Sequence, residues 1–410
     1  MGATTVESPQ LTGQPAGFKT AKGDAVMNIG VGKQTRRAYG FDEIALVPGA
    51  LTVDPDAVDT SVTIAQIEMR VPIFGAAMDG VISPSTASML GKLGGVGVLN
   101  LQGVWTRYED PEDVLNSIAQ ASKDDYVPLM QKIYSMPVQN ALIVKRLRQM
   151  KSEGAPVVVS CTPQVAEDFL PQVQAGGADA LLIQSTVVAM RHHSSSGKFL
   201  DLPRFVAQAN LPIMVGNCVT YETSLELMKI GVAAVFVGIG PGAACTSRGV
   251  LGVGVPMATA IADAVGARND HFTRTGKYVP VVADGGMVVG GDICKAIACG
   301  ADAVMIGSPL AKAEEAPGRG FHWGMATPSP LLPRGARLKV GTIGSLKQII
   351  EGPSTTDDGS MNFKGALQTS MGTLGALTIK DMQQVEVVIA PSILTEGKVY
   401  QKAQHLGMYK

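Results

Sequence analysis

One sequence pattern recurs eight times along this chain and strongly constrains its fold. Each copy is a short apolar run, then a glycine or polar turn, then a stretch with apolar residues at helical spacing. The runs are continuous rather than alternating, which is typical of parallel strands covered by helices. Eight such units predict a (β/α)8 barrel, with an open doubly wound sheet as the alternative. The runs are 71–77, 95–99, 156–161, 180–184, 211–216, 233–238, 279–283 and 303–307.

Three of these units are near copies of one another. Residues 175–183, 230–238 and 299–307 each pass from a glycine directly into a buried run. Glycine tolerates the left-handed backbone at which helices commonly end. Each copy therefore predicts a helix that stops at glycine and a strand that begins within two or three residues.

The domain organisation follows from length and local composition. A chain of 410 residues with 46% apolar residues can form one elaborated barrel with a large core. Residues 1–35 are rich in Gly, Thr, Ser and Lys, so we expect a flexible N-terminal arm. The catalytic barrel is predicted over 36–395, with a Gly-, Pro- and Arg-rich lid at about 315–345 and a tail at 396–410.

Charge and cysteine usage exclude several classes of function. A net charge of −1 argues against nucleic acid as a partner, because phosphate backbones are bound by clustered Lys and Arg. No apolar run reaches the ~20 residues of a membrane helix, and the N-terminus lacks a signal-peptide pattern. The five cysteines are scattered and lack CxxC spacing, which favours a reduced, cytoplasmic protein over a disulfide framework or zinc site.

Cys245 is the strongest candidate for a catalytic residue. It follows the sixth run in a loop with glycines at 238, 240 and 242, and polar residues follow it at 246–248. Active sites of such barrels lie in the loops after the strands. An exposed thiol beside an arginine and near a helix start favours the nucleophilic thiolate. The alternative is a small buried hydrophobe, which is our interpretation of the other four cysteines: Cys161, Cys218, Cys294 and Cys299.

The loops after the last two strands predict a nucleotide site. Asp284 precedes Gly285-Gly286, and Gly307-Ser308 follows the eighth run. This pair of loops commonly binds phosphate through backbone amides, and a strand-end carboxylate could hold ribose hydroxyls. Asn217, after the fifth run, could donate and accept near the same mouth, or could be a turn residue.

Taken together, these loops resemble the IMP dehydrogenase/GMP reductase family over roughly residues 36–390. The most specific element is Gly-Ile-Gly-Pro-Gly-Ala-Ala-Cys-Thr-Ser-Arg at 238–248, followed by Gly-Val-Gly-Val-Pro at 252–256. Supporting elements are Tyr39-Gly-Phe-Asp-Glu-Ile-Ala-Leu-Val-Pro, Ala77-Met-Asp-Gly-Val, Gly216-Asn217, Asp284-Gly-Gly and the stretch from Gly318 to Met325.

The resemblance implies a mechanism and a set of site residues. Cys245 would attack C2 of IMP, hydride would pass to NAD⁺, and hydrolysis of the covalent thioimidate would release XMP. It also implies a potassium ion on backbone carbonyls, a purine nucleotide as ligand and a homotetramer. The implied residues are Cys245, Ser247, Arg334 and Arg337 for catalysis, Met78, Asp284, Gly286, Gly307, Ser308, Gly324 and Met325 for substrate, Gln184, Ser185, Asn217 and Gly238 for cofactor, and Gly240, Gly242 and Cys245 for the metal.

The sequence also departs from the family pattern. The interval from Asn100 to Pro156 is too short for the CBS pair that most family dehydrogenases insert there. The serines that usually contact phosphate are replaced at Ala76 and Ala243, and an arginine is replaced by Phe236. Gln184 stands where many members have an acidic residue, and Ser247 where threonine is usual.

The lid carries neither the Arg-Tyr pair of the dehydrogenases nor the Thr and Glu of the reductases. Arg334 and Arg337 follow it, and we hypothesise that one of them activates water. The pattern looks most like a short bacterial branch without CBS domains, and IMP dehydrogenase is the preferred activity. The alternatives are an NADPH-dependent GMP reductase and a non-catalytic protein that binds purine nucleotides.

Overall fold

The computed structural model describes residues 27–194, 199–324, 329, 335–393 and 395–407. The chain divides after Ala38 into two compact units. The described part of the first unit is a two-stranded antiparallel pair, β1 (Met27–Asn28) with β2 (Gln34–Thr35). The predicted N-terminal arm lies largely outside the described residues, and everything below concerns the second unit.

The second unit is a closed barrel of eight parallel strands, as predicted. The strands follow the chain in order, and β13 pairs with β6 to complete the ring. Every predicted run overlaps one strand, and the closed ring confirms the barrel over the open sheet. The strands are β6 (Ile73–Gly75), β7 (Val96–Asn100), β8 (Val158–Cys161), β9 (Ala180–Gln184), β10 (Ile213–Cys218), β11 (Ala234–Val237), β12 (Val281–Asp284) and β13 (Ala303–Ile306).

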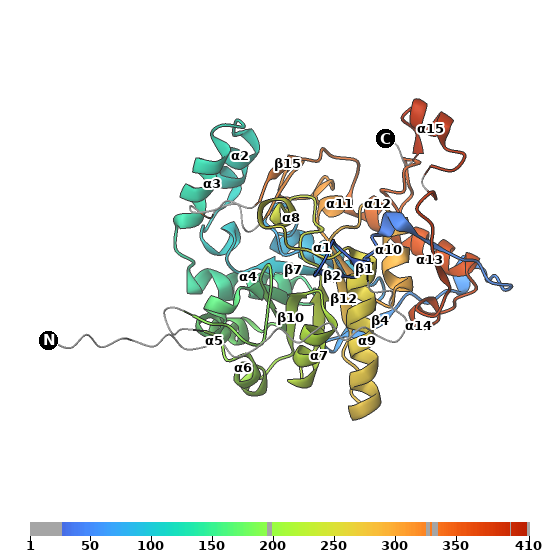
Figure 1. The fold of residues 1–410 in the computed structure, drawn as a ribbon. Helices are drawn as coiled ribbons and strands as arrows, with labels where there is room; N and C mark the ends of the chain where they lie inside the picture. The colour runs from blue at the N-terminus through green and yellow to red at the C-terminus, as the bar shows by residue number, and fades with distance from the viewer. Residues whose placement is uncertain (1–26, 195–198, 325–328, 330–334, 394, 408–410) are drawn as a thin grey trace. The chain divides into compact units, whose positions relative to one another are not determined.

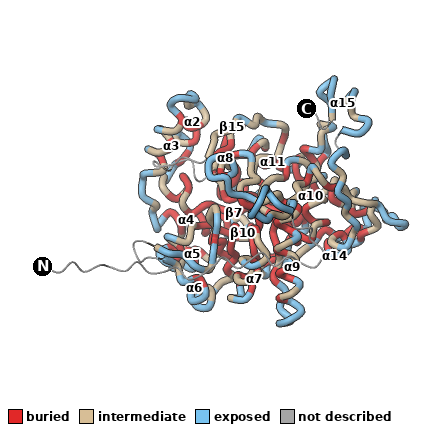
Figure 2. The backbone as a smooth tube through the Cα atoms, viewed as in Figure 1, coloured by how far each residue is buried: buried red, intermediate tan, exposed pale blue. Residues whose placement is uncertain are grey.

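Helices follow each strand and cover the outside of the barrel (Figure 1). Their apolar faces pack on the outward side chains of the strands and form the larger of the two barrel cores. Figure 2 shows buried chain through the barrel and its inner helix faces, with exposed chain at the periphery. The covering helices are α1 (Pro84–Lys92), α4 (Asn140–Ser152), α5 (Ala166–Gly176), α6 (Leu202–Gln208), α7 (Tyr221–Lys229), α9 (Met257–Thr275), α10 (Gly290–Ala298) and α13 (Phe363–Thr373).

The barrel interior is a separate apolar core. Inward side chains of all eight strands meet there, and the hairpin of β4 (Val62–Ile64) and β5 (Ile67–Met69) contributes to the same cluster. Phe236 lies in this interior and packs edge-to-face on Phe74, with ring centroids 5.6 Å apart. The replacement of an arginine at this position therefore fits an apolar interior, in which an unpaired charge would be costly.

Two further antiparallel strand pairs and several short helices lie outside the ring of eight strands. The pair β3 (Ile44–Leu46) with β16 (Val387–Ile389) and the pair β14 (Phe321–Trp323) with β15 (Arg337–Lys339) are both antiparallel. Short helices complete the unit: α8 (Ser247–Leu251), α11 (Ser308–Ala311), α12 (Leu346–Glu351), α14 (Ile379–Met382), α15 (Val399–Ala403), η1 (Phe41–Glu43), η2 (Pro55–Ala57), η3 (Val104–Thr106) and η4 (Pro163–Val165). No helix among the described residues is both long and apolar enough to cross a membrane.

The interval between β7 and β8 holds a small helical hairpin, α2 (Glu112–Gln120) and α3 (Tyr126–Ser135), and not a regulatory domain. Its apolar side chains, including Ile118, Met130 and Ile133, form a third core that also contains Trp323 of β14. This hairpin therefore contacts the strand that leads into the predicted lid.

The repeated Gly-to-strand motif has a common hydrogen-bond geometry. Asp179 and Asp302 occupy the same position in their copies. The Asp179 carboxylate accepts the N–H of Val157, just before β8, and the Asp302 carboxylate accepts that of Val281, the first residue of β12. Their own N–H groups donate back to the same residues' carbonyls. The motif thus sets the register between neighbouring strands.

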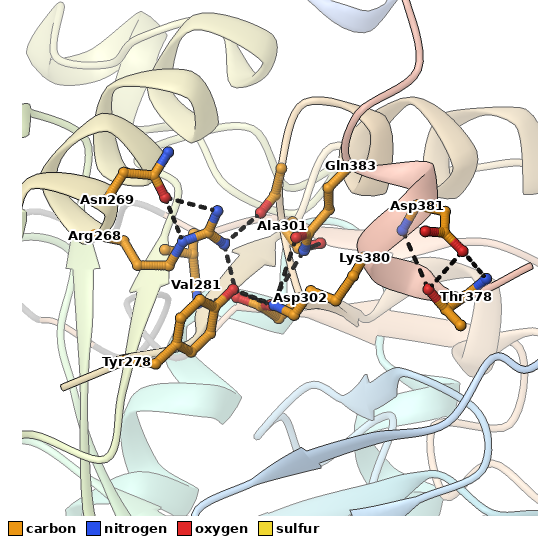
Figure 3. A network of polar contacts seen from close by, with 11 residues as sticks. Arg268, Asn269, Tyr278, Val281, Ala301, Asp302, Thr378, Lys380, Asp381 and Gln383 are labelled. Atoms are coloured by element: carbon orange, nitrogen blue, oxygen red, sulfur yellow. Dashed lines mark hydrogen bonds and ion pairs between the residues drawn. The ribbon is translucent and has the colours of Figure 1, made fainter. Parts of the chain in front are cut away.

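At Asp302 this motif becomes a buried polar network (Figure 3). Arg268 of α9 lies 3.1 Å from the carboxylate, and Lys380 of α14 and the Tyr278 hydroxyl contact its other oxygen. Burial alone would raise the pKa of Asp302, but Arg268 and Lys380 outweigh it and hold the pKa below its ordinary value. The network joins α9 and α14 to the start of β13.

We predict that Asp302→Asn lowers the free energy of unfolding by about 3 kcal/mol, because it leaves the Arg268 guanidinium buried without a counter-charge. Since the pKa of Asp302 is lowered in the folded state, its stabilising contribution should be present near neutral pH and disappear as pH falls through that pKa. Urea unfolding at neutral and acidic pH measures both effects.

Asp179→Asn is the matched control, because Asp179 has the same backbone contact but a partly exposed carboxylate, whose ion pair is with the exposed Lys151. It should cost much less. Equal losses for the two variants would contradict a special role for the buried network.

Candidate active site

Polar side chains from three strands meet at the carboxyl end of the barrel. The Gln184 amide, at the end of β9, donates to Asp284 Oδ2 at 2.9 Å and to Asn217 Oδ1 at 3.1 Å. The Asn217 amide donates to the same Asp284 oxygen at 2.7 Å and to the Gly238 carbonyl at 2.8 Å. One carboxylate oxygen of Asp284 therefore receives two N–H groups, while the structure gives the other, Oδ1, no hydrogen bond from a described residue.

Burial raises the pKa of Asp284 to about 6, although the hydrogen bonds from Asn217 and Gln184 act in the opposite direction. The carboxylate is consequently ionised at neutral pH but within reach of protonation under mildly acidic conditions. The amide of Gln184 is directed at Asp284, and the expected contact of this residue with a cofactor remains a prediction. Ser185, its neighbour, donates its hydroxyl to the Val187 carbonyl at 2.8 Å.

Gly238 allows the cysteine loop to leave the barrel next to Asp284. Its φ is +152°, and a Cβ there would lie 2.2 Å from the Asp284 carbonyl oxygen. Only glycine fits this close approach. Asn217 and Gly238, which the family resemblance assigns to the cofactor side, are hydrogen-bonded to each other, and their contact with a cofactor remains a prediction.

Cys245 is the only partly exposed cysteine in a strand-end loop, among the described residues, and its thiol donates to the Ser247 hydroxyl at 3.3 Å. The remaining cysteines pack into the protein. Burial raises the pKa of Cys161 and Cys299 to about 12, and that of Cys218 and Cys294 to about 11. These four thiols are protonated at neutral pH, which agrees with their interpretation as structural residues.

The cysteine loop lies against the predicted phosphate loop. A Cβ on Gly286 would lie 2.9 Å from Cβ of Pro241, and one on Gly285 would lie 3.3 Å from the Gly242 nitrogen. Both glycines have positive φ, near +80°. The nucleophile's loop and the Gly285-Gly286 turn are therefore packed together, as a single ligand that spans both would require.

The predicted lid returns to the same loop. Cys245 forms an isolated antiparallel bridge with Gly335, and the Ala336 N–H donates to the Ala244 carbonyl at 3.0 Å. A Cβ on Gly324 would lie 3.6 Å from the Ala244 carbonyl oxygen. Gly324 and Gly335, two positions within the predicted lid, therefore both lie close to the cysteine loop. Met325 and Arg334 lie outside the described residues.

The other predicted substrate residues follow β13 and β6, the next two strands of the ring after β12. A Cβ on Gly307 would lie 3.4 Å from Sδ of Met78, and Ser308 begins α11 immediately after Gly307. The same position would be 3.2 Å from Cε1 of His322, a buried residue of β14. Sequence reasoning missed His322, because a single histidine in a three-residue strand carries no periodic or motif signal.

Arg337 does not behave as a free base. Its guanidinium donates to the carbonyls of Ile118 and Ala121 at the carboxyl end of α2, and it stacks on Phe321 with 4.6 Å to the ring centroid. Orphan carbonyls at a helix end are good partners for a cation. This geometry argues against the hypothesis that Arg337 activates water. The side chain instead joins the end of α2 to the strand pair β14–β15.

The loop after β11 supplies the oxygen type that a large monovalent ion prefers. Gly242 presents a carbonyl that accepts the Cys245 N–H at 2.9 Å and retains a second lone pair, and Gly240 has a φ of +78°. Groups of three or more His, Cys, Asp or Glu side chains able to hold a metal are absent from the described residues. A cation at this loop would therefore depend on backbone carbonyls.

Comparison with known sequences identifies the family to which this chain is similar. Residues 38–327 match the family model "IMP dehydrogenase / GMP reductase domain". An uncharacterised oxidoreductase of Mycobacterium tuberculosis is 37% identical, covering 89% of this chain and all of that protein. The inosine-5′-monophosphate dehydrogenase of Methanocaldococcus jannaschii is 27% identical, covering 88% and 94% respectively.

A solved structure agrees in both fold and sequence. The IMP dehydrogenase/GMP reductase-like protein of Corynebacterium glutamicum superposes with a TM-score of 0.84 and 34% identity, covering 89% of this chain and 97% of that protein. Together, the matched domain, the full-length relatives and the shared barrel place this chain in the IMP dehydrogenase/GMP reductase family.

Proposed function

We propose that this protein is an IMP dehydrogenase, which oxidises IMP to XMP through a covalent bond to Cys245 in guanine nucleotide synthesis. The observation that carries the proposal is the packing of the cysteine loop, through Pro241, on the Gly285-Gly286 turn. A nucleotide with its phosphate at that turn and its ribose at Asp284 brings its base to the nucleophile.

Each residue has a defined task in this mechanism. The Cys245 thiolate adds to C2 of the purine, with Ser247 as its hydrogen-bond partner, and water later replaces sulfur at that carbon. Asp284 holds the ribose hydroxyls, and backbone groups of Gly286, Gly307 and Ser308 hold the phosphate. Bound NAD⁺ supplies the acceptor for the hydride that leaves C2.

Other parts of the proposal rest on the family resemblance. Gly324 and Met325 would line the base with Met78, and Asn217 and Gly238 would face the nicotinamide. Potassium would bind the carbonyls of Gly240, Gly242 and Cys245. A homotetramer in the cytoplasm fits the family and the scattered thiols. Arg334 is the remaining candidate for activating water, because Arg337 is engaged by α2.

One assay separates this activity from its alternatives. The purified protein is offered IMP with NAD⁺, and separately GMP with NADPH, while nicotinamide absorbance is followed. We expect signal with IMP and NAD⁺. Signal only with GMP and NADPH would identify a reductase, and signal with neither would favour a non-catalytic nucleotide-binding protein.

Cys245→Ala should reduce turnover by about 10³-fold or more while IMP binding persists, since the nucleophile forms the covalent intermediate but does not hold the phosphate. Turnover by absorbance and binding by calorimetry measure the two effects. Cys299→Ala is the control, because that half-buried thiol lies at the end of α10, outside the active site, and it should retain wild-type turnover. Comparable activity in both variants would remove the nucleophile assignment.

We also predict that kcat/KM for IMP declines as pH falls below about 6, where Asp284 becomes protonated and loses its capacity to accept two ribose hydrogen bonds. Asp284→Asn should weaken IMP binding by about 10-fold or more and eliminate this acidic limb. A pH–rate profile of both proteins tests this. An unchanged limb in the variant would assign it to another group.

A further inference from the structure

Asp79 is a buried carboxylate that the mechanism above does not use. It is 2% exposed and directly follows Met78, which lines the purine base in the proposed mechanism. Its Oδ2 atom accepts the Tyr134 hydroxyl at 2.5 Å and the Val104 N–H at 2.9 Å. Burial raises the pKa of Asp79 to about 6, against the lowering effect of the Tyr134 hydrogen bond. The carboxylate is thus ionised near neutral pH, and its contact with Tyr134 is charge-assisted.

The Tyr134 hydroxyl also accepts a hydrogen bond, from the Trp323 indole N–H at 3.0 Å. Trp323 is 2% exposed, ends β14 and directly precedes Gly324, which also lines the base in the proposed mechanism. A phenol suits this position because its oxygen can donate to one partner and accept from another at the same time. One hydroxyl therefore joins the two segments, the loop after β6 and the end of β14, that are proposed to contact the base.

These two segments also pack directly on each other. A Cβ on Gly80 would lie 3.0 Å from the Trp323 ring, and the Gly318 N–H donates to the Gly80 carbonyl at 3.2 Å. Neighbouring residues of a chain move together, so the way in which Trp323 is held against this loop fixes the spacing between Met78 and Gly324.

The hairpin of α2 and α3, which carries Tyr134, is fastened to the β14–β15 pair at two further points. Arg319, just before β14, forms an ion pair with Glu112 of α2. Arg337 of β15 donates to carbonyls at the end of α2. The hairpin is therefore fixed relative to β14, and the Tyr134 hydroxyl is held where it can keep its two partners at a set spacing.

We propose that Tyr134 is a positioning residue for the purine base of the nucleotide. Its hydroxyl holds Asp79 and Trp323 at a fixed spacing, and the residues next to these two along the chain, Met78 and Gly324, are thereby placed against the base. The inference rests on the proposed nucleotide site and deepens it. It assigns recognition of the base in part to the α2–α3 hairpin, whereas ribose and phosphate are held by the loops after β12 and β13.

Paired binding measurements isolate the contribution of the base. Ribose 5-phosphate carries the sugar and phosphate of IMP without the purine, so its binding does not depend on the base contacts. Tyr134→Phe keeps the ring and removes the hydroxyl, which leaves the Trp323 indole and the Asp79 carboxylate each without one partner. We expect the Kd for IMP, measured by calorimetry, to rise about 10-fold, while the Kd for ribose 5-phosphate, measured by displacement of IMP, stays unchanged. GMP should respond as IMP does.

Two further variants keep the test decisive. Tyr108→Phe is the matched control, because the Tyr108 hydroxyl donates to the Ile133 carbonyl of the same hairpin at 3.0 Å, and it should bind both ligands as the wild type does. Trp323→Phe removes the indole N–H but keeps a ring, so it should also weaken IMP selectively, even if Tyr134→Phe misfolds. Added to Tyr134→Phe, it should cause little further loss, because its partner hydroxyl is already absent.

The outcomes separate this inference from the proposed function. Unchanged IMP binding in Tyr134→Phe and Trp323→Phe, or equal weakening of IMP and ribose 5-phosphate, would overturn the role of Tyr134 alone. A loss confined to the purine nucleotides supports the inference even if turnover proves to be reductive or absent. Failure of the wild type to bind either nucleotide would overturn the nucleotide site and this inference together.

Discussion

Closure of the parallel barrel, through the hydrogen bonds between β13 and β6, is the constraint on which the rest of the site depends. Parallel strands all end on the same side, so closure brings eight loops to one mouth. Residues separated by a hundred positions, such as Gln184 and Asp284, meet there within hydrogen-bond distance. An open sheet of the same strands would have spread these loops along an edge.

Within that mouth, Asp284 links binding to electrostatics. Its carboxylate is buried enough to resist ionisation, and two amides from adjacent strands hold one of its oxygens. The amide at Gln184 matters because an acidic residue there would place two carboxylates side by side and raise the pKa further. The substitution at this position thus leaves one carboxylate in a neutral hydrogen-bonding frame.

The hairpin of α2 and α3 packs against β14, the strand that leads into the predicted lid. Asp79 accepts from Tyr134 of α3, and the Tyr134 hydroxyl in turn accepts from the Trp323 indole at 3.0 Å. A Cβ on Gly103 would clash with the Asp79 carboxylate, so this contact also explains that glycine. The hairpin occupies the interval where many relatives insert a regulatory module, and here it joins the loop after β6 to the strand that enters the lid.

The sequence by itself determined the repeated unit, the eight strands and the barrel, and it singled out Cys245 as the candidate nucleophile, because these depend on local apolar spacing, glycine turns and one specific motif. Tertiary structure alone decided which polar groups are paired. It directed Gln184 to Asp284, engaged Arg337 with carbonyls at the end of α2, and placed His322 beside Gly307 with a ring nitrogen that has no partner among the described residues. The physical reason is that burial and hydrogen-bond partners arise from residues distant in sequence, so no local pattern records them.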